Sequence, residues 1–116
     1  MTGVVAIPPD DVTLAQAALA AAREVPGVAG VSRGRYAIAR TFGLGGRVVE
    51  GIHLRPEPAG LHVEVHVVVQ PVPLLPLAEA VRAAIATTLW GLGVPVTAVD
   101  VWVDDLRLSA AEEDMS

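Results

Sequence analysis

The sequence predicts an α+β fold, a two-layer sandwich in which a mainly antiparallel sheet of three or four strands carries two helices on one face. Residues 61–69 alternate apolar and polar side chains, residues 77–92 repeat apolar ones at helical spacing, and residues 96–106 alternate again. A repeat of two is that of a half-buried strand, and a repeat near 3.6 is that of an amphipathic helix. This order of strand, helix and strand predicts helices and sheet in two layers.

The first helix is expected over residues 12–25, which are rich in alanine and can lie close to a sheet. Thr13 and Gln16 have the spacing of a capping box, in which each side chain satisfies a backbone group at the helix start. Asp10 or Asp11 could cap the helix instead, since either carboxylate suits the positive end of the helix dipole. A proline-glycine pair then ends the helix.

The middle of the chain is expected to hold an irregular strand over residues 28–38, a glycine-rich loop at 43–46 and a strand over 47–55. Residues 56–60 form the predicted turn of a hairpin whose second strand is 61–70. Three prolines end that strand, because proline cannot donate to a strand ladder. The glycine-rich loop lacks the Lys-Ser/Thr pair of a phosphate-binding loop, so we interpret it as a plain connection.

Composition narrows the class of protein. The 116 residues suit one domain, which we place at residues 4–108, followed by an acidic, disordered tail at 109–116. The absence of cysteine excludes disulfides, thiolate zinc sites and cysteine nucleophiles. No apolar run reaches the roughly 18 residues that span a bilayer, and the start of the chain lacks the pattern of a secretory signal. We therefore expect a cytoplasmic protein without direct membrane insertion.

A candidate metal site lies on the predicted strand 61–70. His62, Glu64 and His66 share one strand face, and imidazole and carboxylate groups are ligands for zinc and similar ions. His53 on the neighbouring strand of the hairpin could join them. The favoured interpretation is nevertheless the polar, solvated face of a half-buried sheet, because a spacing of two residues does not by itself direct two rings at one ion. No metal or other cofactor is expected.

Residues 33–55 form a basic region. This segment contains five arginines and one acidic residue, Glu50, although the whole chain has a net charge of −5. These arginines are Arg33, Arg35, Arg40, Arg47 and Arg55. They make an RNA-binding module an alternative function, since guanidinium groups bind phosphates. The negative net charge and the lack of an aromatic stacking pair on a strand argue against nucleic acid. We favour a basic surface that faces an acidic surface of another protein or copy.

Two tryptophans provide the candidate interaction residues. Trp90 lies off the apolar stripe of its predicted helix, and Trp102 lies on the opposite strand face from the valines around it. Exposed tryptophan is enriched at protein interfaces. Alternatively, residues 109–116 or the N-terminal arm cover Trp102. We therefore predict an interaction surface formed by Trp102, Val68 and His66, with Arg33 and Arg47 adding charge complementarity.

The sequence offers little for catalysis. None of its three serines lies in a Gly-x-Ser-x-Gly turn, and the adjacent Asp104 and Asp105 alternate to opposite strand faces. An enzyme using His62, Glu64 and His66 remains an alternative, but the sequence favours a protein that is not an enzyme.

Three segments together resemble the bacterial alkaline shock protein family, also called general stress or envelope stress response proteins. They are Glu24-Val25-Pro26-Gly27-Val28 after the alanine-rich helix, Gly51-Ile52-His53-Leu54 before the alternating strand, and Val99-Asp100-Val101-Trp102-Val103 at the end. The sequence departs from the family pattern at Gln70-Pro71-Val72-Pro73, where many relatives have Tyr-Gly, and at Asp100, where Asn is usual.

The resemblance implies a small cytoplasmic protein linked to the cell envelope, of a family in which some members are tethered to the membrane by a partner. No catalytic residues are implied. The expected function is that of a non-catalytic scaffold or adaptor, which acts by forming homo-oligomers or by docking to a membrane-associated protein.

Overall fold

The computed structural model describes residues 10–32 and 39–108. The predicted boundary at residue 4 and the predicted tail at 109–116 lie outside these residues, as do Arg33, Arg35 and Tyr36. In chain order the elements are α1 (Asp11–Glu24), β1 (Val28–Val31), β2 (Arg40–Phe42), the 3₁₀ turn η1 (Leu44–Gly46), β3 (Val48–Glu50), β4 (Ile52–Glu57), β5 (Gly60–Val69), α2 (Leu74–Gly91) and β6 (Val96–Leu106).

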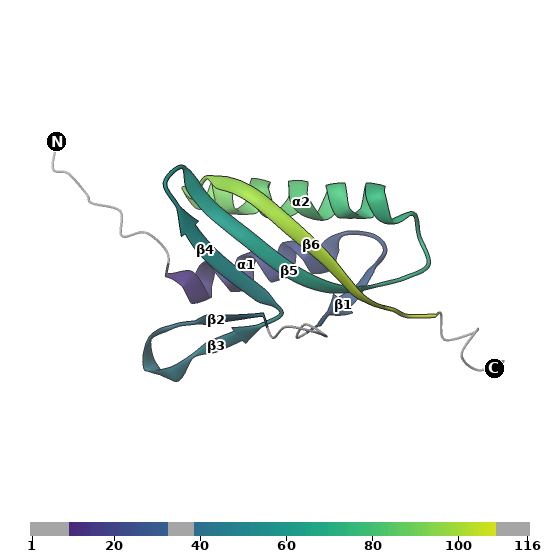
Figure 1. Ribbon diagram of the computed structural model, residues 1–116, viewed down its shortest axis with the longest axis horizontal. Helices are drawn as coiled ribbons and strands as arrows, with labels where there is room; N and C mark the ends of the chain where they lie inside the picture. The colour runs from purple at the N-terminus through teal and green to yellow at the C-terminus, as the bar shows by residue number, and fades with distance from the viewer. Residues whose placement is uncertain (1–9, 33–38, 109–116) are drawn as a thin grey trace, which may run out of the picture.

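Strand β5 is the centre of the main sheet (Figure 1). β4 pairs antiparallel with its first half and β1 pairs antiparallel with its last residues. β6 runs parallel to β5 along nearly its whole length, so β1 and β4 share the other edge. The parallel pairing follows from α2, because a helix between two neighbouring strands returns the chain to the same end of the sheet.

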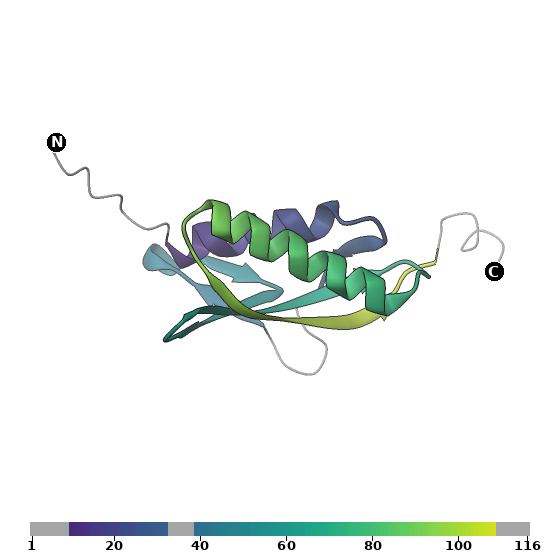
Figure 2. The ribbon, with the colours of Figure 1, turned by 90° about the horizontal axis from the view of Figure 1, so that it is seen from above.

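The two helices lie side by side on one face of this sheet (Figure 2). The predicted α+β two-layer sandwich is therefore confirmed. The helix boundaries differ from the prediction by one to three residues. The start of α1 is capped by Asp10, whose Oδ1 accepts a hydrogen bond from the backbone N–H of Thr13 at 2.8 Å. The carboxylate alternative for the cap is thus the one observed.

Gly51 divides the segment that the sequence predicts as one strand, 47–55. Its φ of +90° turns the chain between β3, which pairs with β2 in a separate hairpin, and β4, which joins the main sheet. A Cβ atom at this position would collide with the Val31 side chain and the Ser32 carbonyl oxygen. The position therefore requires glycine for both its φ and the close approach of neighbouring backbone.

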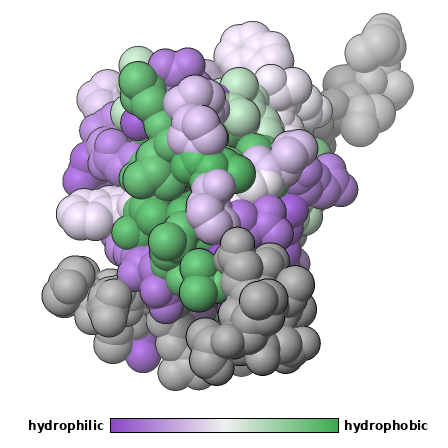
Figure 3. Space-filling model, turned by 90° about the vertical axis from the view of Figure 1, so that its right-hand side faces the viewer, coloured by the Kyte–Doolittle hydropathy of each residue, from purple (hydrophilic) through white to green (hydrophobic). Residues whose placement is uncertain are grey.

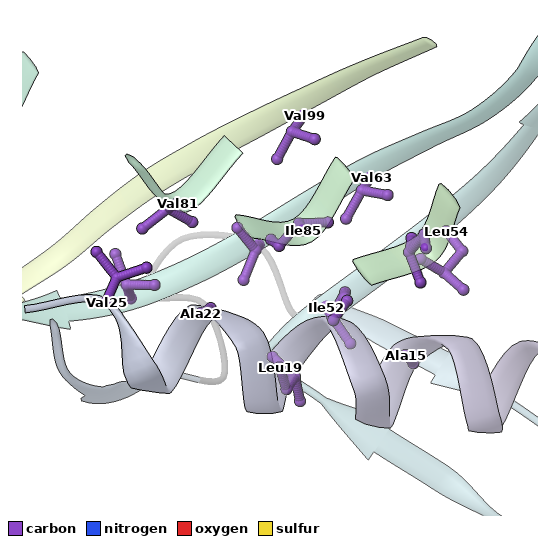
Figure 4. Packing of buried hydrophobic residues seen from close by; sticks show 14 of the residues in the cluster. Ala15, Leu19, Ala22, Val25, Ile52, Leu54, Val63, Val81, Ile85 and Val99 are labelled. Carbon is purple, nitrogen blue, oxygen red and sulfur yellow. The ribbon is translucent and has the colours of Figure 1, made fainter. Parts of the chain in front are cut away.

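The core lies between the helices and the inner face of the sheet (Figure 4). The predicted burial of Val63, Val65, Val67, Val99 and Leu89 is confirmed, whereas Val101, predicted on the same buried face, is only half-buried. Further core contacts come from small and branched side chains of the two helices: Ala15, Ala18, Leu19, Ala22, Val81 and Ile85. Full burial of each large aliphatic side chain contributes about 1.5–3 kcal/mol to stability. The helices therefore cover the sheet face that carries these side chains, and the opposite face stays open.

Candidate functional site

The open sheet face is the side of the main sheet that carries no helix. Because side chains alternate along strands, the inward valines leave a polar row on β5 and a matching row on β6. The residues of this face are His53, Arg55, His62, Glu64, His66, Val68, Asp100, Trp102 and Asp104. The parallel register places Glu64 beside Asp100 and His66 beside Trp102.

His66 is held between two carboxylates. Its Nε2 lies 2.8 Å from Oε2 of Glu64, and its Nδ1 lies 3.0 Å and 3.1 Å from the two carboxylate oxygens of Asp104. The residue is only 3% exposed, and the Asp104 side chain is 7% exposed. An ionised carboxylate only accepts hydrogen bonds, so both contacts are satisfied together when both ring nitrogens carry protons. This arrangement fixes the ring in one orientation.

A register irregularity brings Asp104 to His66. Val67 of β5 pairs with Val103 and Val68 pairs with Asp105, which leaves Asp104 as the extra residue on β6. An inserted residue of this kind re-aims a side chain. It here turns the Asp104 carboxylate across to β5.

Trp102 covers the imidazole. The two rings are stacked, with centroids 5.6 Å apart and 12° between their planes. Trp102 is half exposed, so its other side meets solvent. Trp90, near the end of α2, is also exposed.

His62 belongs to a second group of side chains. Arg55 donates to its Nδ1 over 2.9 Å, and its Nε2 lies 2.7 Å from Oδ2 of Asp100. A guanidinium cannot accept a hydrogen bond, so Nδ1 is the acceptor and the Nε2–H donates to Asp100. Both ring nitrogens of His62 are therefore engaged. Glu57 stands nearby, and a hydrogen bond from the Thr97 hydroxyl, helped by the charge of Arg55, lowers the pKa of its carboxyl.

The structure thus divides the candidate set His62, Glu64 and His66. Glu64 and His66 are in contact, whereas His62 turns to Asp100. His53 does not join them, because its Nδ1 contacts the backbone carbonyl oxygen of Arg40. Within residues 10–32 and 39–108, no group of three His, Asp or Glu side chains is arranged to hold a metal ion.

The other predicted interaction residues are dispersed. Trp102 and the half-buried Val68 lie on the open sheet face, but His66 is too deeply buried to touch a partner directly. Arg47 lies just before β3 on the separate hairpin, 3.9 Å from Asp10. Arg55 is engaged by His62.

Asp100 and Asp104 are the site residues that sequence reasoning missed. Both lie 38 positions from the histidines they contact. The alternation on β6 places Asp100 on the same face as Trp102, so the sequence alone could have identified Asp100 as a residue of the candidate site. Asp104 depends on the inserted residue, which the alternation does not reveal.

Comparison with known proteins yields structural likeness only. No family model and no curated protein matches the chain. The chain is similar to the copper form of the MamM CTD, with a TM-score of 0.54 and 16% identity over 90% of this chain and 96% of that one. Another MamM CTD structure gives a TM-score of 0.50 with 16% identity, over 83% and 99% of the two chains. A histidine-to-alanine variant of it gives 0.50 with 15% identity, over 83% and 98%.

These matches correct the family assignment. The chain shares its fold with MamM CTD structures, and the resemblance to the alkaline shock protein family, with the envelope stress role that it implied, is wrong. The three quoted segments have local structural causes. Gly27 and Gly51 occupy turns with positive φ, and the final segment is the alternating strand β6. Any sandwich with these turns and strands produces similar short motifs, so they do not identify a family.

Among the described residues, no helix is both long enough and apolar enough to cross a membrane.

Proposed function

We propose that this chain is a non-catalytic binding domain that takes up a divalent transition-metal ion on its open sheet face. The ligands are Nε2 of His66 and the Glu64 carboxylate, and Asp104 positions the ring. The observation that carries the proposal is the clamping of a buried imidazole between two carboxylates at 2.8 Å and 3.0 Å. The copper form of a protein with this fold adds support.

The chemistry of the donors fits such an ion. Imidazole and carboxylate together suit zinc, copper, nickel and manganese, and a ligating histidine usually donates its other N–H to a carboxylate. Asp104 already occupies that second position at Nδ1. The ion would replace the proton on Nε2, and Glu64 would change from hydrogen-bond acceptor to ligand.

The set is incomplete with two protein ligands. Asp100 is the nearest further carboxylate, because it is the register partner of Glu64 on β6. Its present contact is the Nε2–H of His62. Recruitment of Asp100 would break that hydrogen bond, so we expect weaker binding than in a preformed site of three or four ligands.

The test is titration of the purified, metal-free protein with zinc chloride and with copper sulfate, followed by calorimetry. Glu64→Gln keeps the shape of the side chain and removes its charge, so it should weaken binding at least tenfold. The matched control is His53→Gln, which alters an exposed histidine on the same face and should leave the affinity unchanged. Binding that survives Glu64→Gln, or that is lost in His53→Gln alone, would overturn the proposal.

A second candidate function is docking of a partner protein on the same face. The half-exposed Trp102 favours it, because a large aromatic beside an aliphatic side chain such as Val68 is typical of an interface anchor. Pull-down of a partner by the wild type and its loss with Trp102→Ala, under metal-free conditions, would distinguish docking from metal uptake.

A further inference from the structure

The end of the sandwich where α2 begins and β6 ends carries a separate apolar surface. α2 has 18 residues and spans about 27 Å, whereas β6 has 11 residues and spans about 36 Å. The strand is therefore longer than the helix that covers it. Val103 and Leu106 pair with the inward-facing Val67 and Val69, yet both are substantially exposed.

Five large, exposed aliphatic side chains lie at this end. They are Leu74, Leu75, Val103, Leu106 and Leu108, each between 40% and 68% exposed. We call them the end patch. Figures 1 and 2 both place the start of α2 beside the end of β6, and Figure 3, which views this end, shows a hydrophobic surface running through its centre. The backbone N–H of Arg107 donates to Val69 at 2.7 Å, which holds the strand end against β5.

The size of the end patch fits one half of a protein interface. Its five side chains expose roughly 400 Å² of apolar surface, within the range of functional patches on small proteins. A standard interface buries about 800 Å² on each partner, and a little over half of that is non-polar. The patch thus supplies the apolar share of one such interface, and polar residues around it supply the remainder.

The charges at its rim favour a second copy of this chain. Asp105 and Arg107 flank Leu106 and are both exposed. When two strand ends run antiparallel about a two-fold axis at Leu106, Asp105 of one copy stands opposite Arg107 of the other, twice. Asp104 stands opposite the apolar Leu108, so no two acids are placed against each other. The same symmetry sets the apolar side chains of the two copies together.

We propose that the end patch is a homodimer surface, in which two copies meet about a two-fold axis at Leu106. The contact uses neither of the metal ligands proposed above, so either proposal can be wrong without the other. Each copy contributes the leucines at the start of α2 and at the end of β6, and the Asp105–Arg107 pairs fix the alignment.

The test is sedimentation velocity of the full chain without metal, up to high micromolar concentration. The wild type should form dimers. Leu75→Glu should raise the dissociation constant about 100-fold, because a buried leucine is lost twice in a two-fold dimer. The variant should fold normally, since Leu75 is the more exposed leucine of the first turn of α2, where an acid suits the helix dipole. Leu44→Glu is the control, because Leu44 is 90% exposed on the hairpin, and it should remain dimeric.

Charge reversal tests the alignment. Asp105→Arg should weaken the dimer, and adding Arg107→Asp in the same chain should restore it. A wild type that stays monomeric, a Leu75→Glu variant that dimerises as well as the wild type, or dimers lost only with Trp102→Ala would each overturn the proposal. Calorimetric zinc titration of Leu75→Glu separates the two proposals, because its metal affinity should equal that of the wild type.

Discussion

The indole of Trp102 lies almost parallel to the imidazole of His66, with 5.6 Å between the ring centroids. The two residues are register partners on neighbouring parallel strands, so the backbone pairing itself sets the stack. The indole shields a ring that is already bound by carboxylates at both nitrogens. Burial strengthens these charged contacts by removing water from around them.

Removing this cover should destabilise the domain. Trp102→Ala is expected to lower the free energy of unfolding by about 1 kcal/mol or more, because stacked aromatic pairs contribute about 0.5–1.5 kcal/mol beyond their area. Urea denaturation would measure the change. Trp90→Ala is the matched control, since Trp90 is more exposed than Trp102 and should cost less. Equal losses for both variants would show that the stack contributes nothing.

Asp104 is expected to act as a positioning residue for His66. Asp104→Asn keeps the size of the side chain and removes the charge that faces Nδ1 at 3.0 Å. It should cost about 1–3 kcal/mol of stability and weaken zinc binding by about 10–100-fold. Denaturation and calorimetry would provide the two readouts. Glu79→Gln, at an exposed position on α2, should change stability by less than about 0.5 kcal/mol; similar effects in both variants would contradict the assigned role.

The sequence predicted the layers well because burial is encoded in local periodicity. The alternation on β5 and β6 and the apolar stripe on α2 each identify their inward face without knowledge of the partner. The hairpin of β2 and β3 was not predicted, because the segment 47–55 appears continuous and only the positive φ of Gly51 divides it. Glycine tolerates this conformation, but a glycine in the sequence does not by itself predict a positive φ.

The candidate site was predicted only in part, since its contacts depend on strands distant in the sequence. The strand face of His62, Glu64 and His66 follows from alternation. Alternation does not predict which neighbouring side chain each imidazole contacts, because Arg55 and Asp100 reach His62 from two different strands. The family assignment failed for the opposite reason. Short motifs of turn glycines and alternating valines are local, and many unrelated sandwiches share them.

The helix cap predicts a pH dependence. Hydrogen bonds from Thr13 lower the pKa of Asp10 below its usual 3.8, with a smaller effect from Arg47. Because the pKa of Asp10 is lower in the folded state, the ionised cap stabilises the fold at pH values above the ordinary pKa of this carboxyl. This contribution falls as the pH drops through the lowered pKa. Asp10→Asn retains an N-cap without the charge, so the difference in melting temperature from the wild type should shrink toward zero in acid.

The control for this measurement is Asp11→Asn, which removes the same charge from the first turn of α1 without altering the cap hydrogen bond. Its melting curve should not reproduce the pH profile of the Asp10 variant. Thermal unfolding followed by circular dichroism across the acid range provides both curves. A difference between Asp10→Asn and the wild type that stays constant with pH would contradict the role of the ionised cap.

Gly51, between β3 and β4, should tolerate substitution poorly. Gly51→Ala places a Cβ at a φ of +90°, against the side chain of Val31 and the carbonyl oxygen of Ser32. The left-handed conformation alone costs an ordinary residue about 1–2 kcal/mol, and the collision adds to it because a backbone atom cannot move aside. Gly30→Ala is the matched control, since a Cβ there meets nothing within 4 Å. Urea denaturation should show a loss of at least about 2 kcal/mol for Gly51→Ala and little change for Gly30→Ala. If the two variants unfold at the same urea concentration, Gly51 is not what turns the chain from the hairpin into the main sheet.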